Sequence, residues 1–461
     1  QLNGRVLKIA PDIQSEVKAY LQKKGLPLDI AVTFEDVTIV DFKSDIPSRS
    51  AITDTRSRLA KDIFLNTPMV SANMDTITES RMAIALARLG GLGFIHQLLP
   101  IEKRVQEVRK VKRADSGVIE NPFSIHPEAT LHEAKELMEG GPAGLLVTDK
   151  LTQKLVGIIT ARDIRFEKME DKRVAEVMTQ APLITAPRGT TLEQARLILD
   201  KNKIEKLPLV DEDGRVAGLI TSKDILKIEQ YPKALRDAKG RLMVGAAVGV
   251  SGSFAEEAGA LARAGADVIL IDTARGFSAR LEEAIRAVRF AVGDLPIVAS
   301  NVDTPEGALM LIEAGADAVK VGIGPGSVCK TREGPAVGTP QITAVAECTA
   351  VAQKYDIPVM ADGGIQGGAH FCKALAAGAS TVMIGRLLAG TEEAPGEPFY
   401  EDGEKWKIYR GSASLEFQLS RLDRSEDERI RASEGVPRRV RYTGEAKSVV
   451  EELMGYLRSS M

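Results

Sequence analysis

A glycine-rich loop that contains one cysteine is the stretch of this sequence best suited to chemistry. It spans residues 321–334 and follows a short apolar run, residues 318–321, which indicates a buried strand. Glycine permits positive φ angles and lets a ligand approach the backbone closely. Cys329 lies in this loop beside Lys330 and Arg332, and nearby positive charge favours the thiolate, the nucleophilic form of cysteine. The alternative is a buried structural cysteine next to a turn.

The composition limits the classes of protein to which the chain can belong. Its 461 residues indicate two or three domains, and 44% hydrophobic residues exclude global disorder. A formal net charge of −3 gives no basic surface for nucleic acid, and no apolar run reaches the roughly 18 residues of a membrane span. Three cysteines without a CxxC pair, and no signal peptide, predict a cytoplasmic protein. Four scattered histidines argue against a zinc site.

Short apolar strands alternate with helices in two parts of the chain, which predicts a parallel sheet covered on both faces. The expected strands are residues 68–72, 92–96, 244–248, 268–271, 297–299, 318–321, 359–361 and 382–384. Two strands before an interruption and six after it make eight βα units, the number in an α/β fold of the (β/α)8 TIM barrel type. Residues 1–114 and 229–461 would form this barrel. A doubly wound sheet is the alternative, but no GxGxxG sequence follows the first strand.

The interruption, residues 115–228, contains an internal repeat with copies at about 115–170 and 174–228. Each copy is expected to run helix, strand, turn, strand, helix, and the pair resembles a tandem CBS (Bateman) module. In that family a Thr-x-x-Asp sequence after the last strand holds the ribose of an adenine nucleotide. Two pairs fit that pattern and imply an adenine or guanine nucleotide as regulator: Thr160 with Asp163, and Thr221 with Asp224. The alternative is that they serve only as helix N-caps.

In a TIM barrel the active site is built from the loops that follow the strands. The loops after the seventh and eighth strands bind phosphate through backbone N–H groups, and here they contain Gly363, Gly364 and Gly385. Ser327 can add a hydroxyl group, and Asp362 can accept hydrogen bonds from a ribose. A tight turn is the alternative for each glycine, but three such loops together favour a phosphorylated sugar or nucleotide with an electrophilic carbon near the cysteine.

Four stretches of the sequence resemble the IMP dehydrogenase/GMP reductase family: residues 322–329, 361–364, 388–393 and 409–411. A CBS pair between the second and third barrel strands also fits that family. The resemblance implies a homotetramer or octamer of barrels, a nicotinamide cofactor, and a covalent intermediate between Cys329 and C2 of a purine nucleotide. It also implies that Thr331 handles protons, with Glu434 as its carboxylate partner.

The resemblance extends to the residues that would hold the ligands. The expected substrate-binding residues are Met74, Asn301, Ser327, Asp362, Gly363, Gly364, Gly385, Arg386, Tyr409 and Gly411. At the cofactor we expect Asp272, Gly322 and Gly324, and a monovalent cation, K+, would be held by backbone carbonyl groups of Gly324, Gly326 and Cys329. Arg386 departs from the family, which has a small serine there, and a guanidinium group can bind phosphate in a bidentate manner.

The choice between the family's two reactions depends on the segment from residue 411 to 434. The dehydrogenase hydrolyses its cysteine adduct with an Arg-Tyr pair on a mobile flap, whereas residues 421–427 here are Arg-Leu-Asp-Arg-Ser-Glu-Asp. We therefore expect an NADPH-dependent GMP reductase that converts GMP to IMP and ammonia. IMP dehydrogenase with NAD is the alternative within the family. Alternatives of other classes are a nucleotide-sensing barrel without turnover and a barrel lyase or isomerase that needs no thiolate.

Overall fold

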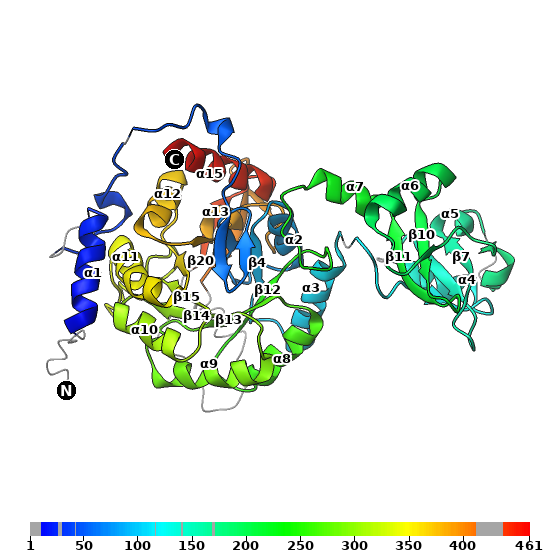
Figure 1. Ribbon diagram of the computed structural model, residues 1–461, viewed down its shortest axis with the longest axis horizontal. Helices are drawn as coiled ribbons and strands as arrows, with labels where there is room; N and C mark the ends of the chain where they lie inside the picture. The colour runs from blue at the N-terminus through cyan, green and yellow to red at the C-terminus, as the bar shows by residue number, and fades with distance from the viewer. Residues whose placement is uncertain are drawn as a thin grey trace. The chain divides into compact units, whose positions relative to one another are not determined.

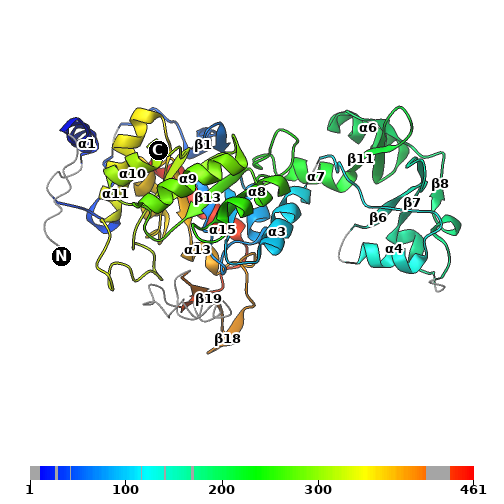
Figure 2. The same ribbon diagram turned by 90° about the horizontal axis from the view of Figure 1, so that it is seen from below.

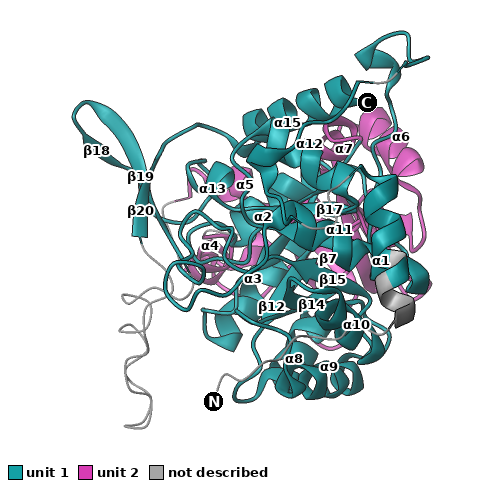
Figure 3. Cartoon of the chain, turned by 90° about the vertical axis from the view of Figure 1, so that its left-hand side faces the viewer, with its two compact units in different colours: residues 1–112, 233–235, 242–461 teal, residues 113–232, 236–241 magenta. Residues whose placement is uncertain are grey.

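The chain folds into two compact units, which Figure 3 shows in different colours. The computed structural model describes residues 11–25, 30–41, 43–115, 117–139, 142–167, 171–411 and 437–461. Unit 1 comprises residues 1–112, 233–235 and 242–461, and unit 2 comprises residues 113–232 and 236–241. The interruption expected at 115–228 falls inside unit 2.

Unit 1 is a closed barrel of eight parallel strands with helices around it (Figure 1). The strands are β3 (Met69–Ser71), β4 (Leu92–Ile95), β12 (Gly245–Val248), β13 (Val268–Asp272), β14 (Ile297–Val302), β15 (Ala318–Val321), β16 (Val359–Asp362) and β17 (Thr381–Ile384). Each strand pairs with the next, and β17 closes the barrel against β3. The expected (β/α)8 TIM barrel is confirmed. The doubly wound alternative is wrong, because such a sheet would leave two open edges.

Helices that follow the strands cover the outside of the barrel. They are α2 (Ser80–Arg88), α3 (Ile101–Arg113), α8 (Phe254–Ala264), α9 (Ala279–Val292), α10 (Pro305–Glu313), α11 (Gln341–Ala352), α12 (Gly368–Ala377) and α13 (Arg386–Ala389). Local sequence sets where they begin: the Ser278 side chain accepts a backbone N–H group at the start of α9, and Thr304 does the same for α10. No helix in the described ranges is long and apolar enough to cross a bilayer.

The sequence Ala-Gly-Ala-Asp occurs twice between a helix and the next strand. Gly265 caps α8 with a φ of +104°, and Gly315 has a φ of +102° just after α10 ends. Asp267 and Asp317 each accept, at 2.8 Å, the backbone N–H group at the start of the preceding strand. The glycines therefore end the helices, and the aspartates tie neighbouring strands together at the amino end of the barrel.

Smaller elements pack around the barrel within unit 1. Val17 and Leu21 of helix α1 (Pro11–Lys23) form an apolar cluster with residues of α11. A three-stranded antiparallel sheet has β19 (Glu404–Arg410) as its middle strand, which carries Tyr409; β18 (Phe399–Glu401) and β19 of this sheet are labelled in Figure 2. Further elements are the hairpin of β1 (Ser57–Ala60) and β2 (Ile63–Leu65), the third strand of the sheet, β20 (Pro437–Arg441), and α15 (Ala446–Ser460), which packs on α12.

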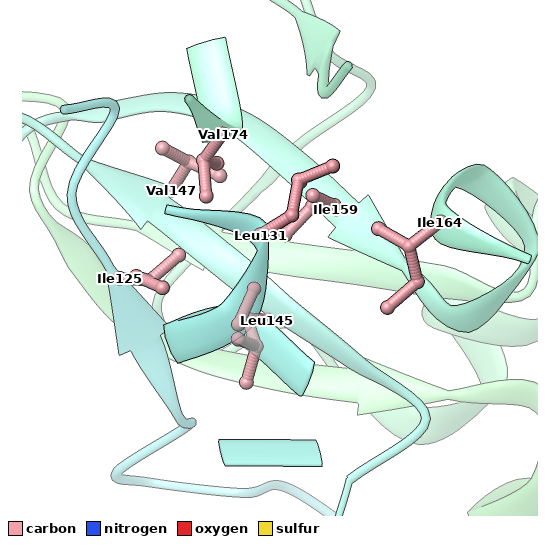
Figure 4. Packing of buried hydrophobic residues seen from close by; sticks show 8 residues of the cluster. Ile125, Leu131, Leu145, Val147, Ile159, Ile164 and Val174 are labelled. Atoms are coloured by element: carbon pink, nitrogen blue, oxygen red, sulfur yellow. The ribbon is translucent and has the colours of Figure 1, made fainter. Parts of the chain in front are cut away.

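Unit 2 contains the order strand, helix, strand, strand, helix twice, and the first copy has one additional strand. The first copy has β5 (Ser124–Ile125), α4 (Leu131–Met138), β6 (Gly144–Thr148), β7 (Leu155–Thr160), α5 (Ala161–Ile164) and β8 (Thr179–Gln180). The second has β9 (Ala186–Pro187), α6 (Leu192–Asn202), β10 (Lys206–Val210), β11 (Val216–Thr221) and α7 (Ser222–Gln230). Each copy has its own apolar core, and Figure 4 shows the first, with Leu131, Leu145 and Ile159 packed between α4, β6 and β7.

Candidate active site

Cys329 lies beside a hydroxyl group in the loop that follows β15, which we call the cysteine loop (residues 321–334). Its Sγ is 3.2 Å from Oγ1 of Thr331, a hydrogen-bonding distance for sulfur, and either atom can be the donor. Thr331 is buried, whereas Cys329 is partly exposed. The thiol can therefore meet a ligand while it keeps a hydrogen-bonding hydroxyl group next to it.

Arg332 holds the two sides of the cysteine loop together. Its Nε donates to the carbonyl oxygen of Ile323 at 2.9 Å, and its terminal guanidinium nitrogen donates to that of Thr339. Gly324, with a φ of +82°, makes room for this side chain, because an added Cβ would be 2.4 Å from Cγ of Arg332. The backbone around the cysteine is thus fixed by a buried part of an arginine side chain.

The cysteine loop packs directly on the loop that follows β16. Gly322 has a φ of +149°, and an added Cβ there would be 2.0 Å from the carbonyl oxygen of Asp362. Gly363 has a φ of +89°, and its added Cβ would be 2.9 Å from Cγ of Pro325. The side chain of Gln341 donates to backbone carbonyl groups at the ends of β15 and β16, at 2.9 and 3.1 Å. Glycine is required at these contacts, and it brings the two loops together.

A lysine that sequence reasoning did not single out joins three of the expected site residues. Lys320 lies in β15 and is 2% exposed. Its Nζ donates to Oδ2 of Asp362 at 2.6 Å, to Oδ1 of Asn301 at 2.9 Å and to Oδ1 of Asp272 at 3.2 Å. Nδ2 of Asn301 donates to the same Oδ2 of Asp362 at 2.9 Å. Four adjacent strands, β13 to β16, thus place polar side chains around one ammonium group. A lysine inside an otherwise apolar strand was the signal for it in the sequence.

The charge of Lys320 is balanced by two carboxylates. Burial alone would lower the pKa of its ammonium group, but Asp362 and Asp272 outweigh burial and raise this pKa above its ordinary value. Each carboxylate keeps its other oxygen without a hydrogen bond to a described residue, and the side chains are 23% and 16% exposed, respectively. These outer oxygens can accept hydrogen bonds from hydroxyl groups of a ligand.

Tyr409 lies beside the loops that were predicted to bind phosphate. Burial raises the pKa of its hydroxyl group to about 12, although the nearby side chain of Ser327 and the charge of Arg386 act in the opposite direction. Its Oη is 3.9 Å from Sδ of Met74, and an added Cβ at Gly385 would be 3.0 Å from this Oη. Oγ of Ser327 is buried and has no hydrogen-bond partner in the described part of the chain. A buried hydroxyl group of this kind suits a site for an oxygen-rich ligand.

Two arginines on this side of the site differ in their surroundings. Nε of Arg410, next to Tyr409, donates to Oδ2 of Asp75 at 2.8 Å, and the carboxylate is 12% exposed. This ion pair fixes β19 to the loop that follows β3. Arg386, at the start of α13, is exposed and forms no ion pair with the residues that the structure describes. Its guanidinium group is therefore available to an anion.

Most of the residues predicted for the site lie in these two groups. Near Lys320 and the cysteine loop are Asp272, Asn301, Gly322, Gly324, Gly326, Ser327, Cys329, Thr331, Asp362, Gly363 and Gly364. Near Tyr409 are Met74, Gly385, Arg386 and the buried Gly411. Glu434 lies outside the described residues. The ligand-binding roles of all of them stay predictions.

The Thr-x-x-Asp pairs of unit 2 form helix N-caps in the structure. The backbone N–H group and Oγ1 of Thr160 both donate to Oδ2 of Asp163 at 2.7 Å, at the start of α5. Oγ1 of Thr221 donates to Oδ2 of Asp224 at 2.5 Å and accepts the N–H of Asp224 at 3.3 Å, at the start of α7. This geometry agrees with the capping alternative, and nucleotide binding by these pairs stays a prediction.

Metal binding by side chains finds no support in the described ranges, which contain no group of three or more His, Cys, Asp or Glu residues able to hold an ion. A monovalent cation would depend on backbone carbonyl groups of the cysteine loop instead. The carbonyl oxygen of Gly326 accepts the N–H of Cys329 at 3.0 Å. The K+ site at Gly324, Gly326 and Cys329 therefore stays a prediction.

Known proteins match this chain along most of its length. A sequence model described as the IMP dehydrogenase / GMP reductase domain matches residues 31–461. Inosine-5′-monophosphate dehydrogenase of Aquifex aeolicus (strain VF5) is 50% identical over 437 residues, which cover 93% of this chain and 89% of the relative. The protein of the same name from Bacillus subtilis (strain 168) is 46% identical over 438 residues, which cover 93% of this chain and 89% of the relative.

Solved structures are similar as well. GMP reductase from Trypanosoma brucei in complex with guanosine 5′-monophosphate has a TM-score of 0.88 and 38% identity, with 95% of this chain and 92% of that chain covered. The same enzyme in complex with guanosine 5′-triphosphate has a TM-score of 0.80 and 34% identity, with 95% and 94% covered. Since the sequence model, the relatives and the folds agree with the motifs around Cys329, this chain belongs to the IMP dehydrogenase/GMP reductase family of oxidoreductases.

Proposed function

We propose that the protein is a GMP reductase that uses NADPH to convert GMP to IMP and ammonia. The main support is the sequence of residues 411–434, which contains no Arg-Tyr pair. The contact of Cys329 with Thr331 supports a covalent reaction at the cysteine. Without a pair that activates water, an adduct between the cysteine and the purine is hydrolysed slowly, and the reductive reaction is favoured. The similarity to T. brucei GMP reductase supports the same choice.

The nucleotide's phosphate group would bind to the backbone N–H groups of three glycines. Gly363 and Gly364 follow β16, and Gly385 follows β17, so their N–H groups lie at the same end of the barrel. The hydroxyl groups of Ser327 and Tyr409 would complete this site, and both are buried beside it. The phosphate would then be recognised by neutral donors at the edge of the barrel, with the exposed guanidinium group of Arg386 as a charged donor beside them.

The ribose and the base would extend from there toward the cysteine loop. The outer oxygen of Asp362 accepts hydrogen bonds from the ribose hydroxyl groups, since its other oxygen is already bound by Lys320 and Asn301. In the proposed orientation, C2 of the purine would face Cys329. Purine C2 is an electron-poor amidine carbon, to which a soft thiolate adds readily.

In the proposed reaction the Cys329 thiolate forms a bond to C2 of GMP, and the 2-amino group leaves as ammonia. Thr331, 3.2 Å from the sulfur, and Glu434 pass protons to this leaving group. A bound nicotinamide cofactor supplies the hydride that C2 then receives. The carbon–sulfur bond breaks with its electron pair returning to sulfur, which gives IMP and the thiolate. Two protons are consumed, and ammonium and NADP+ are the other products.

The residues expected at the cofactor fit a nicotinamide nucleotide. Asp272 ends β13 and presents one carboxylate oxygen without a hydrogen bond to a described residue, which suits ribose hydroxyl groups. Gly322 and Gly324 in the neighbouring loop have positive φ angles, and they bring the backbone of the cysteine loop close to Asp362 and Arg332. The chain's own residues thus supply a carboxylate and a tightly folded glycine loop next to the cysteine.

Several further parts of the proposal concern regulation and assembly. We assign unit 2 to a tandem CBS module that binds an adenine or guanine nucleotide, on the basis of its two similar halves. The assembly would be a homotetramer or octamer, with K+ bound by backbone carbonyl groups of the cysteine loop. A cytoplasmic location is supported by the three cysteines, which are all unpaired.

IMP dehydrogenase with NAD is the second candidate function. It is favoured by the curated relatives of that name, which are 46–50% identical to this chain. The two reactions differ in their substrates, in the cofactor and in the fate of the adduct, since the dehydrogenase needs water and the reductase releases ammonia.

The deciding experiment records nicotinamide absorbance with the purified full-length protein. One sample contains GMP and NADPH, and the other contains IMP and NAD. We expect a loss of absorbance in the first sample alone. A gain in the second sample alone would establish the dehydrogenase and overturn the proposal. Cys329→Ala should abolish the signal, whereas Cys372→Ala, which removes a buried thiol on α12, should retain it.

A further inference from the structure

Lys320 has no place in the chemistry described so far, although it contacts three of the residues around the ligands. We infer that Lys320 is a positioning residue that holds Asp362 in the orientation by which the enzyme selects ribonucleotides over deoxyribonucleotides. The inference rests on the proposed function in one respect, the assignment of Asp362 to the ribose of the substrate.

The geometry around Asp362 supports this role. Oδ2 accepts hydrogen bonds from Nζ of Lys320 at 2.6 Å and from Nδ2 of Asn301 at 2.9 Å. Both donors extend from strands in the closed barrel, and Asn301 also donates to the carbonyl oxygen of Gly322 at 2.8 Å. Two donors on one oxygen stop the carboxylate from turning. The other oxygen then keeps a constant direction toward a ligand.

The charges around Lys320 show what its removal would do. Asp272 and Asp362 both contact the ammonium group, and Oγ of Ser300 donates to Asp272 at 3.3 Å. Without the ammonium group, two carboxylates would share a poorly hydrated space with only neutral donors. Like charges then favour protonation of one carboxyl group or its rotation toward water. Either change would spoil Asp362 as an acceptor for ribose hydroxyl groups.

Another buried lysine of the barrel provides a matched control. Lys112 is 5% exposed, and its Nζ lies 3.0 and 2.9 Å from the two carboxylate oxygens of Asp267. Oδ2 of this aspartate also accepts the N–H of Val244 at the amino end of the barrel. Both oxygens are therefore occupied within the protein. This pair is a structural tie, whereas the pair of Lys320 and Asp362 leaves one oxygen for a ligand.

The test compares the affinity for GMP with that for 2′-deoxy-GMP, measured by calorimetry without cofactor. The full-length wild type is compared with Lys320→Met, Lys320→Arg and Lys112→Met. We expect the wild type to prefer GMP and Lys320→Met to lose about tenfold or more of that preference. Lys320→Arg keeps the charge and should retain most of it. Lys112→Met should lower the melting temperature without changing the ratio of the two affinities.

If Lys320→Met binds GMP and 2′-deoxy-GMP more weakly by the same factor, the inference is overturned. Removal of a purely structural lysine would lower stability without changing the ratio of the two affinities. If Lys320→Met does not fold, Lys320→Gln takes its place, with the same expected loss and the same contrary result. IMP and 2′-deoxy-IMP are titrated in parallel. A protein that binds IMP and not GMP would overturn the proposed substrate, and the ratio for the IMP pair would still decide the role of Lys320.

Discussion

Replacing Tyr409 by phenylalanine should weaken substrate binding without disturbing the fold. The contact of its Oη with Sδ of Met74, at 3.9 Å, is weak, and the hydroxyl group of the neighbouring Ser327 stays in place in the phenylalanine variant. In the proposed complex this hydroxyl group donates to the nucleotide phosphate. A hydrogen bond to a charged group contributes about 1.5–3 kcal/mol. The substitution removes that contribution and little else.

This loss corresponds to a rise in the KM for GMP of roughly 10- to 160-fold, since about 1.4 kcal/mol equals a factor of ten. The value of kcat should change little, because the phosphate is remote from the reacting carbon. The assay is the initial rate of absorbance change, with GMP varied at saturating NADPH. Tyr442→Phe serves as the control, because the ring of Tyr442 lies under Lys405, 3.8 Å from its Nζ, and outside the site.

An unchanged KM in Tyr409→Phe would refute the assignment of this hydroxyl group to the phosphate. A fall in kcat at constant KM would instead place the group in the chemical step. The ratio of the KM values of variant and wild type should not change with pH near neutrality, because a pKa of about 12 keeps the Tyr409 hydroxyl group protonated.

The same burial of Tyr409 affects stability at alkaline pH. The pKa is 10.0 in the unfolded chain and about 12 in the folded protein, so the unfolded state binds fewer protons between these values. Stability from this residue is therefore complete below pH 10 and is lost as the pH rises toward 12. Chemical denaturation across this interval should show a shallower decline for Tyr409→Phe than for the wild type.

Three other substitutions or reagents test separate parts of the site. An alkylating reagent should modify Cys329 first, and GMP should protect Cys329 from it, as peptide mapping can show. Cys348 should stay unmodified, because burial raises the pKa of its thiol. Equal labelling of the two cysteines would contradict the site. Gly322→Ala places a Cβ 2.0 Å from the carbonyl oxygen of Asp362 at a position with a positive φ. The substitution should lower the free energy of unfolding by roughly 2–6 kcal/mol and abolish turnover. A melting curve like that of the wild type would contradict this prediction. Arg410→Met removes the ion pair with the carboxylate of Asp75 and should lower the free energy of unfolding by about 1–2 kcal/mol. It should also raise the KM for GMP, because the ion pair fixes β19 to the loop that follows β3. An unchanged KM would show that the ion pair does not position β19.

The barrel was predictable because its strands are short apolar runs whose period is distinct from that of the helices. The end of α8 follows from local sequence, because Gly265 readily takes the left-handed conformation with a φ of +104° that closes a helix. The hydrogen bond that Asp267 accepts from the N–H group of Val244, at the start of the preceding strand, was not predicted. It depends on which strands are neighbours, and a sequence alone does not give that pairing.

The same limit explains what was missed in the site. Cys329 and Thr331 are two residues apart, so their contact follows from local sequence. Lys320 contacts Asp272 and Asp362, which are far from it along the chain and meet it only because β13 to β16 curve around one barrel. Its strand indicated burial, and the partners that make burial of a lysine tolerable appear only in the folded structure.

The central claim is that Cys329 carries a purine through reductive loss of its 2-amino group. The most direct test incubates GMP with NADPH and the full-length protein, and then counts IMP, ammonium and NADP+. The account predicts equal amounts of all three with the wild type and none with Cys329→Ala. Formation of XMP from IMP and NAD, with no ammonium released from GMP, would contradict it.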